Sequence, residues 1–352
     1  MVDTDEYALL KTFHCLPRTT RGLPASITTT PKGDKLVFCN DKSVHMVNTT
    51  NLTDVDSYTE HAALTTVAKF SPSGFYCASG DQQGNVRIWD TTQSTHILKA
   101  TYPIISGAIR DIAWSEDSKR LAAVGEGHDR FGHVILFDTG TSNGSLTGQT
   151  RPISTIDFRP TRPHHIVAGS DDNSIALFQG PPYKFRTTFN EHKRFVLVTR
   201  YAPDGSMFAS AGADGRIVLF EGVDGVRQGD LVDDACEDVA AHDGSVFGLA
   251  WSPDGSRIAS ASGDRTVKIW NVATRQMEKT VTFGSELQDQ QLAIVWSRVA
   301  LVSVALSGFL NFIDPELGVV SKSVHGHNKP ITAMALSSDK SFLCTADFEG
   351  NI

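Results

Sequence analysis

A histidine, an aspartate and a serine lie close together in this 352-residue chain, and these residue types can together perform nucleophilic catalysis. They are His242, Asp264 and a serine at Ser260 or Ser262, followed by Trp270. In a hydrolase triad the aspartate orients the histidine, which takes the proton of the attacking serine. The same residues can also form a buried hydrogen-bonded network, so the elements that position them decide between the two interpretations.

The stretch from Ala241 to Asn271 is one copy of a repeat that recurs along the chain. In three copies a histidine precedes an aromatic residue by 28 positions: His242 and Trp270, His61 and Trp89, and His192 and Phe220. Fixed spacing within a period of roughly 40–45 residues is typical of WD repeats, each of which supplies four strands to a β-propeller. The sequence therefore predicts an all-β, WD-repeat β-propeller.

Positions equivalent to the Trp-Asp pair of the repeat give the number of blades. Seven such pairs occur at intervals of 41 to 50 residues: Val47-Asn48, Trp89-Asp90, Phe137-Asp138, Phe178-Gln179, Phe220-Glu221, Trp270-Asn271 and Ile313-Asp314. We therefore expect a seven-bladed β-propeller over residues 23–324. The apolar runs Val86–Trp89 and Val267–Trp270, which are rich in β-branched residues, are expected to be inner strands.

An eighth copy of the repeat opens at Gly326-His327. Counting 28 residues on from His327 places its aromatic residue at position 355, beyond Ile352. Domain boundaries seldom fall inside a strand. We interpret residues 325–352 as the opening of an eighth repeat, in a truncated second propeller of a longer protein.

The repeat favours a structural role for the candidate triad. In WD repeats these positions form a buried hydrogen-bonded network, which stabilises only when all its members are satisfied. Blade 5 carries part of it again, with His192 and Asp214, and a repeated site is not a unique active site. In other blades the aspartate is replaced, by Gln83, Phe131 and Ser307. We assign His242, Asp264 and Trp270 to a structural tetrad and expect no enzymatic activity.

Other candidate sites are weak. Gly125-Glu126-Gly127 lacks the third glycine and the following helix of a phosphate-binding loop. The histidines between positions 128 and 165 share no metal-ligand spacing. The acidic stretch Asp230–Asp238 is interpreted as a solvated insertion, with calcium binding as the alternative. We expect no cofactor, no metal and no catalytic residue.

Composition and charge exclude several classes of partner. The net charge of -8 is a poor match for nucleic acid or an anionic membrane. The apolar stretch Gln291–Leu310 contains Arg298 and follows the repeat period, so we expect two buried strands rather than a membrane span. Five cysteines without paired spacing, and an N-terminus without an apolar run, indicate a reducing, cytoplasmic compartment.

Several motifs lie in loops and outer strands, outside the repeat pattern. They are Leu16–Gly22, Tyr58–His61, Arg87–Gln93, Asp117–Gly127, Gly169–Asn173, Gly180–Phe185 and Asp289–Leu292. Together they resemble the actin-interacting protein 1 family, the WD-repeat cofactors of cofilin. The resemblance covers essentially the whole chain.

This resemblance implies two seven-bladed propellers in tandem and a location in the cytoplasm, at the cytoskeleton. The implied partners are actin filaments and cofilin (actin-depolymerising factor). The implied activity is severing and disassembly of cofilin-decorated filaments, with capping of their barbed ends and no covalent chemistry. The N-terminal segment 1–22 contains a strand that would complete the second propeller. Residues 1–15, including Leu10 and Phe13, are therefore expected to pack only weakly against residues 23–324.

The resemblance also points to four protein-binding residues: Asp129, Asp171, Phe185 and Phe195. Asp129 lies between the second and third strands of blade 3, and Asp171 lies in the equivalent turn of blade 4. Phe195 lies in the loop entering blade 5, so these three positions share one face of the ring. Phe185 follows two prolines on an outer strand. Two alternatives remain open, because Phe195 could be a core residue and Asp171 could only cap its turn.

Two other functional classes are compatible with a propeller. The chain could be a generic WD-repeat scaffold for another protein complex, or a propeller enzyme. An enzyme would need a polar, ligand-sized pocket at the central channel with strongly perturbed ionisable groups.

Overall fold

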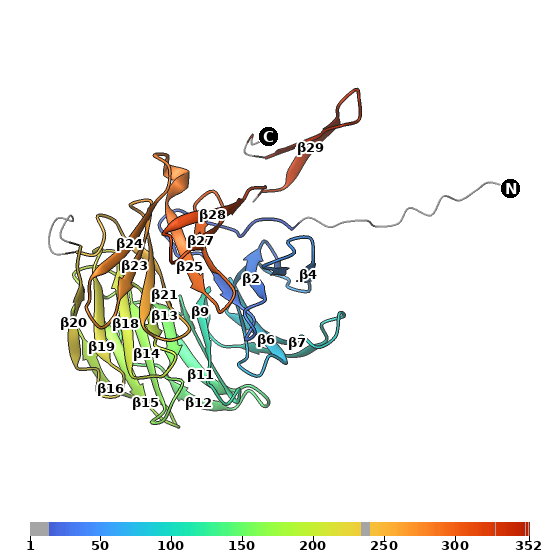
Figure 1. Ribbon diagram of the computed structural model, residues 1–352. Coiled ribbons are helices and arrows are strands. Elements are labelled where there is room, and N and C mark those ends of the chain that lie inside the picture. The colour runs from blue at the N-terminus through green and yellow to red at the C-terminus, as the bar shows by residue number, and fades with distance from the viewer. Residues whose placement is uncertain (1–13, 234–239, 328, 349, 351) are drawn as a thin grey trace.

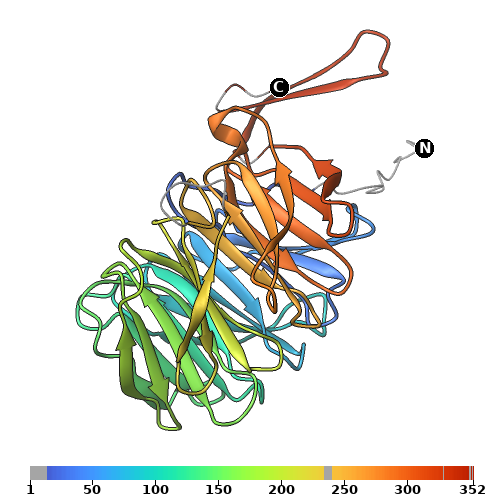
Figure 2. The same cartoon turned by 60° about the vertical axis from the view of Figure 1, so that its left-hand side comes forward.

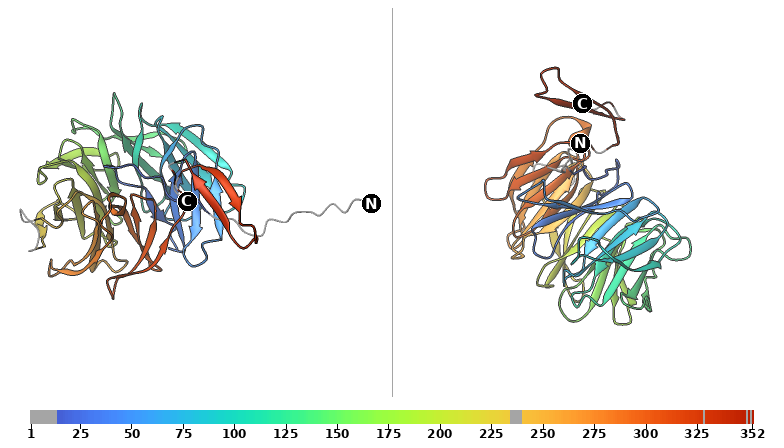
Figure 3. Two further views of the ribbon diagram at one scale, coloured as in Figure 1. Left: turned by 90° about the horizontal axis from the view of Figure 1, so that it is seen from above. Right: turned by 90° about the vertical axis from the view of Figure 1, so that its right-hand side faces the viewer.

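A ring of β-sheets forms the body of the molecule. The computed structural model describes residues 14–233, 240–327, 329–348, 350 and 352. Within them, seven antiparallel four-stranded sheets follow one another as blades (Figures 1 and 2), and their first strands line a central channel, which confirms the all-β, seven-bladed propeller. The left-hand view of Figure 3 shows the ring from above.

The strands run outward from the channel in sequence order within every sheet. The first strands, which line the channel, are β1 (Ile27–Thr29), β5 (Thr65–Phe70), β9 (Ile109–Trp114), β13 (Ile153–Phe158), β17 (Val196–Tyr201), β21 (Val246–Trp251) and β25 (Gln291–Trp296). The second strands are β2 (Lys35–Asn40), β6 (Tyr76–Asp81), β10 (Arg120–Gly125), β14 (His165–Ser170), β18 (Met207–Gly212), β22 (Arg257–Ser262) and β26 (Leu301–Ala305). The third strands are β3 (Ser43–Asn48), β7 (Asn85–Asp90), β11 (Gly132–Leu136), β15 (Ile175–Gln179), β19 (Ile217–Glu221), β23 (Thr266–Asn271) and β27 (Leu310–Asp314). The outer strands are β4 (Val55–Tyr58), β8 (Leu98–Pro103), β12 (Ser142–Ser145), β16 (Lys184–Phe189), β20 (Arg227–Leu231), β24 (Met277–Thr282) and β28 (Val319–Val324).

The expectation that Val86–Trp89 and Val267–Trp270 are inner strands was wrong. They lie in β7 and β23, the third strands of their sheets. A third strand is covered on both faces by the neighbouring blades, so its run is apolar. The first strands instead carry polar residues such as Lys69 and Asp111, because they line the channel.

The apolar core is divided among the interfaces between blades. Seven clusters of buried side chains each combine residues of two adjacent blades, so every one of the seven interfaces has its own cluster. The largest fully buried side chains are Trp89 and Trp270, in the third strands of blades 2 and 6. A blade cannot bury its faces alone, and stacking of neighbours is what stabilises the repeat.

The N-terminal segment closes the ring between blades 7 and 1. Leu16 is 1% exposed and belongs to the cluster at this interface. The Thr19 hydroxyl donates a hydrogen bond to the Leu306 carbonyl at 2.6 Å, and the Ala25 amide donates to the Leu292 carbonyl at 3.1 Å. The segment therefore links the first blade to the last, although no strand is exchanged between the two sheets.

The expected weak packing of residues 1–15 stays a prediction, because the structure describes only His14 and Cys15 of that range. The His14 ring makes an edge contact with Phe38 of β2, with 6.0 Å between centroids. Cys15 packs against the same interface cluster, and burial raises the pKa of its thiol to about 11. Leu10 and Phe13 lie outside the described residues.

After the seventh sheet, a two-stranded hairpin of β29 (Ile331–Leu336) and β30 (Leu343–Asp347) stands apart from the ring (Figures 1 and 3). The apolar stretch Gln291–Leu310 contains the two buried strands β25 and β26, as expected. The short 3-10 helix η2 (Leu287–Asp289) precedes them. The described part of the chain contains no helix with the length and apolarity that a membrane crossing needs.

A charged network crosses the inner strands of four blades. The Asp111 carboxylate of β9 lies 2.8 Å from the Lys69 ammonium of β5 and 3.1 Å from the Arg200 guanidinium of β17. It also accepts a hydrogen bond from the Ile156 amide of β13 at 3.1 Å. Burial alone would raise the pKa of Asp111, but the two cations lower it to about 2. The ionised carboxylate therefore joins blades 2, 3, 4 and 5.

Candidate protein-binding site

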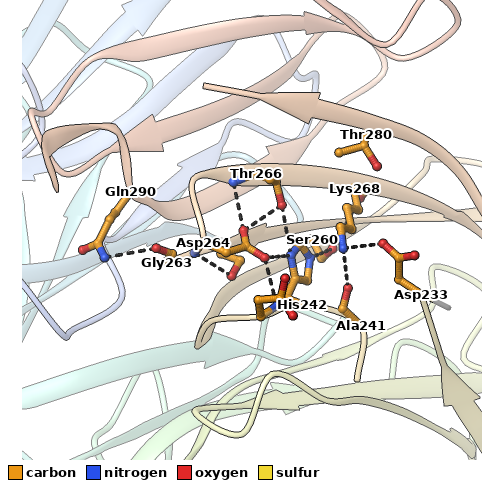
Figure 4. Close-up of polar contacts among 12 residues, drawn as sticks. Asp233, Ala241, His242, Ser260, Gly263, Asp264, Thr266, Lys268, Thr280 and Gln290 are labelled. Atoms are coloured by element: carbon orange, nitrogen blue, oxygen red, sulfur yellow. Dashed lines mark hydrogen bonds and ion pairs between the residues drawn. The ribbon is translucent and has the colours of Figure 1, made fainter. Parts of the chain in front are cut away.

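The residues that resemble a catalytic triad form a continuous hydrogen-bonded network in blade 6 (Figure 4). His242 Nδ1 lies 2.8 Å from Asp264 Oδ2, and His242 Nε2 lies 2.7 Å from Ser260 Oγ. The Trp270 indole N–H donates to Ser260 Oγ at 2.9 Å. The sequence left the serine open, and the structure selects Ser260; the Ser262 hydroxyl instead accepts a bond from the Asp264 amide.

Local backbone geometry places His242 in this network. The amides of Ala241 and His242 both donate to the carbonyl of Gly215, in the turn between the second and third strands of blade 5. Gly215 has a φ of +75°, and a Cβ atom there would lie 2.3 Å from the His242 carbonyl oxygen. Only glycine combines this left-handed backbone with so close an approach. The network therefore ties blade 6 to blade 5.

The pKa values of His242 and Asp264 both lie below their ordinary values, for different reasons. Burial lowers the pKa of His242 below its ordinary value, against the opposing effect of Asp264. Burial alone would raise the pKa of Asp264, but hydrogen bonds from His242 and Thr266 lower it. Ser260 is fully buried and His242 is 1% exposed, so a substrate has no access to the hydroxyl in this arrangement.

Related networks occur in three other repeats. In blade 5, His192 contacts Ser210 at 2.8 Å and Asp214 at 3.1 Å. The eighth repeat pairs His327 with Thr345 at 2.9 Å and with Asp347 at 3.1 Å. Repetition of one arrangement along the chain supports a structural role rather than a single catalytic centre.

Blade 2 carries an incomplete copy of the network. His61 Nε2 lies 2.6 Å from Ser79 Oγ, to which the Trp89 indole also donates at 3.0 Å. His61 Nδ1 is buried and has no hydrogen-bond partner among the described residues. The position of the missing aspartate is occupied by Gln83, which is exposed. Burial lowers the pKa of His61 to about 4.

We expect Gln83→Asp to stabilise the ring, because the new carboxylate would accept a hydrogen bond from His61 Nδ1. The gain is expected to be about 1 kcal/mol at pH 7.5, measured by urea unfolding. The folded pKa of His61 lies below its ordinary value of 6.5, so its burial costs stability as the pH falls from 6.5 toward 4. The aspartate would raise this folded pKa and reduce the loss at pH 5.

The matched control is Gln82→Asp, which makes the same change at the neighbouring exposed position. It is expected to change the free energy of unfolding by less than about 0.5 kcal/mol. Equal effects of the two substitutions would mean that His61 gains no partner from position 83.

Two of the four residues suggested for protein binding line the same cavity, at one mouth of the channel. Asp171 and Phe195 line one cavity of about 390 Å³. Phe195 is 44% exposed, which excludes the alternative of a core residue. Asp171 accepts hydrogen bonds from Arg110 at 2.7 Å and from the Ser154 hydroxyl at 2.6 Å.

The turn-capping role proposed as the alternative for Asp171 belongs instead to its neighbour. Asp172 accepts a bond from the Ser174 amide at 3.0 Å and another from the Thr150 amide at 2.8 Å. Asp171 therefore orients Arg110, which donates to it across 61 positions of sequence, from blade 3 to blade 4.

The other two suggested residues lie away from this cavity. Asp129 is exposed in the loop between β10 and β11, the same loop that contributes Glu126 to the cavity wall. Phe185 is 43% exposed on the outer strand β16, where its ring makes an edge contact with Phe178 at 6.1 Å. The four residues therefore form a discontinuous surface over blades 3 to 5.

Sequence reasoning missed three residues of the cavity wall. Arg110 donates to Glu126 of blade 3 at 2.8 Å and to Asp171 of blade 4 at 2.7 Å, and so joins these two blades at the cavity. Arg18 and Leu23 come from the N-terminal segment, which crosses the mouth opposite them. A charged residue at the second position of an inner strand could have drawn attention to Arg110, whereas Arg18 and Leu23 lie outside the repeat.

The described residues contain no group of three or more His, Cys, Asp or Glu side chains placed to hold a metal ion. Asp230, from the acidic insertion, pairs with Arg216 and with Arg227 at 2.8 Å. Asp233, from the same insertion, lies 2.7 Å from the Lys268 ammonium. Residues 234–239 of this stretch lie outside the described residues.

The repeats match a known family model, "WD domain, G-beta repeat", over residues 52–90, 140–179, 183–221, 236–271 and 318–352. Each of the first three matches begins near the outer strand of one sheet and ends with the third strand of the next. Blades 1, 3 and 7, whose first three strands fall outside the matches, still form complete four-stranded sheets. Interface packing thus preserves the blade where the polar network has been lost.

Whole-chain comparison finds similar proteins in several animals. The chain is 58% identical over 347 residues to "Actin-interacting protein 1" of Caenorhabditis elegans, covering 99% of the chain and 57% of that protein. It is 46% identical to "WD repeat-containing protein 1" of Xenopus tropicalis, covering 98% and 57% respectively. It is 45% identical to "Actin-interacting protein 1" of Drosophila melanogaster, covering 95% and 54%. The chain thus spans just over half the length of these relatives.

Proposed function

The chain belongs to the WD-repeat family and, within it, to the actin-interacting protein 1 group, and from this membership we propose that it is a non-catalytic, actin-binding module of the cytoskeleton. Its proposed target is the actin filament decorated with cofilin (actin-depolymerising factor). Its proposed effect is to promote severing and disassembly of that filament and to cap the barbed end. The alternative is a generic WD-repeat scaffold for another complex.

The observation that carries this proposal is the similarity to proteins named for interaction with actin, at 58% identity over 99% of the chain. Fold alone does not determine function. The specific dependence on cofilin rests on the loop motifs, such as Leu16–Gly22 and Gly180–Phe185, that resemble the family outside the repeat pattern.

The surface of blades 3 to 5 supports a role in protein recognition. Phe185 and Phe195 are 43% and 44% exposed, and aromatic residues at such positions often anchor protein interfaces. Asp129 lies in the exposed loop beside the channel mouth, and Asp171 holds Arg110 at its rim. We propose that these four residues contact the decorated filament or position groups that do.

We also propose that residues 325–352 open a second propeller and that the ring spans residues 23–324. The hairpin of β29 and β30 supports this, because no sheet formed by the described residues covers its apolar side chains. Met334 and Phe342 are each 70% exposed. In a form of the protein that continues beyond this hairpin, both residues should be protected from solvent-accessible labelling, and continued full labelling would contradict the assignment.

The functional test compares filament disassembly with and without cofilin. The full-length protein should shorten cofilin-decorated filaments in time-lapse fluorescence microscopy and leave bare filaments largely unchanged. Alanine at Asp129, Asp171, Phe185 and Phe195 together should reduce the shortening rate at least tenfold. Stability should change little at the exposed positions, by under about 0.5 kcal/mol each.

The matched control is Phe75→Ala. Phe75 is 60% exposed in the turn between β5 and β6, at the opposite end of the strands from Phe195. It should leave disassembly unchanged. Equal severing of bare and decorated filaments would exclude the dependence on cofilin, and no effect on either would favour the generic scaffold.

A further inference from the structure

The mouth of the channel on the Phe195 side is a shaped cavity with two walls. One wall comes from blades 3 to 5 and contains Arg110, Asp171 and Phe195. The other wall is the N-terminal segment Arg18–Ala25. A volume of about 390 Å³ lies at the lower end of the range typical of ligand pockets, so it suits a few side chains rather than a whole domain.

The N-terminal wall is held in place by hydrogen bonds to both blades that it joins. The Arg18 amide donates to the Cys39 carbonyl of β2 at 3.0 Å, and the Ala25 amide donates to the Leu292 carbonyl of β25 at 3.1 Å. Between them, the Leu23 amide donates to the Thr20 carbonyl at 3.2 Å and makes a turn. The wall is therefore a built part of the ring, and it presents Leu23 in a defined place.

The cavity contains apolar surface on both walls. Leu23 is 46% exposed and Phe195 is 44% exposed, and Leu197 and Ile109 form part of the lining between the strands. Exposed large apolar side chains that line one cavity favour an apolar side chain as occupant, because its burial removes both surfaces from water.

The charges of the cavity leave one cation available. Arg110 is neutralised by Glu126, at 2.8 Å, and by Asp171, at 2.7 Å. The half-buried Arg18 also lines the cavity, and no hydrogen bond or ion pair joins its guanidinium to another residue in the described part of the chain. A guanidinium without a partner favours a carboxylate, with which it can form two parallel hydrogen bonds.

We propose that this cavity binds a peptide segment of a protein partner that carries a large apolar side chain next to a carboxylate. The apolar side chain packs between Leu23 and Phe195, and the carboxylate pairs with Arg18. The inference rests on the proposed function in taking the actin–cofilin filament as the partner. It adds the N-terminal segment to the binding surface and makes Arg18 and Leu23 specificity-determining residues.

The first arm of the test measures co-sedimentation of the 352-residue chain with cofilin-decorated filaments. Arg18→Glu should weaken binding at least tenfold, because it places a negative charge against the partner carboxylate. The matched control is Arg21→Glu, the same charge reversal at an exposed residue three positions away and outside the cavity. It should change the Kd by less than twofold. If the chain binds filaments, equal weakening by both variants, or unchanged binding in Arg18→Glu, overturns the proposal.

The second arm separates the cavity from the identity of the partner. In one set of peptides, Phe or Leu is followed directly by Asp. In the control set, Asn replaces that Asp. The Asp peptides should bind the chain, the Asn peptides should bind at least fivefold more weakly, and Arg18→Glu should remove the difference. If the chain fails to bind filaments but shows this preference, the proposed function fails and the cavity assignment stands. If no Asp preference appears in that case, the cavity assignment fails as well.

Discussion

Replacing Asp111 by alanine is expected to destabilise the ring by about 3–5 kcal/mol, which is the typical cost of removing one partner of a buried ion pair. The carboxylate lies 2.8 Å from the Lys69 ammonium and 3.1 Å from the Arg200 guanidinium. Its removal takes one carboxylate away from two partly buried cations. It also removes the acceptor for the Ile156 amide of the next blade.

The measurement is the free energy of unfolding in urea, in wild type and in Asp111→Ala. Asp111→Asn is a second variant, which keeps the shape and one acceptor but loses the charge, and it should give a smaller loss. Glu116→Ala, at an exposed turn position, is the control and should change stability by under about 0.5 kcal/mol. A loss below about 1 kcal/mol in Asp111→Ala would show that the network contributes little.

The same carboxylate gives a pH dependence with a defined sign. Its folded pKa, about 2, lies below the ordinary value of 3.8. The unfolded state therefore binds more protons between these values, so the contribution of Asp111 is present above pH 4 and is lost as the pH falls toward 2. Between pH 4 and 2 the wild type should lose stability more steeply than Asp111→Asn.

The internal repeat explains why the blades and the tetrad could be predicted from sequence. A fixed spacing of 28 residues places His242, in the loop before β21, and Trp270, in β23, within one repeat, where both contact Ser260 of β22. The contacts that could not be predicted join residues from different blades. Arg110 and Asp171 are 61 positions apart, and Asp111 and Arg200 are 89 apart. No period relates these pairs, so only the closed ring shows that they meet.

The same distinction applies to the candidate binding residues. The repeat correctly places Asp129, Asp171 and Phe195 in loops at one end of the strands, because loop position follows from strand order. It cannot show that Asp171 is engaged by Arg110, or that the N-terminal segment supplies a second wall to the cavity. That segment lies outside the repeat, and its position depends on hydrogen bonds to Cys39 and Leu292.

Leu16→Ala is expected to cost about 2–5 kcal/mol, because it removes a buried leucine and leaves a cavity at the interface that closes the ring. Leu16 is 1% exposed, in the cluster shared by blades 7 and 1. Its carbonyl accepts a hydrogen bond from the Asn40 side chain at 2.7 Å, and its amide donates to the His327 carbonyl at 3.2 Å. These backbone contacts hold the side chain in place, so the site has little freedom to collapse around the smaller alanine.

The location of the effect separates ring closure from general destabilisation. Blades 7 and 1 share no strand, so their contact depends on the side chains of this cluster and on the N-terminal segment that crosses it. Amide hydrogen exchange in Leu16→Ala should therefore accelerate first in β1, β2, β25 and β26, and only later in blades 3 to 5. The matched control is Leu23→Ala in the same segment, at a side chain that is 46% exposed, which should leave both stability and exchange nearly unchanged. Uniform acceleration around the ring, or equal effects of the two substitutions, would show that Leu16 does not hold the closure.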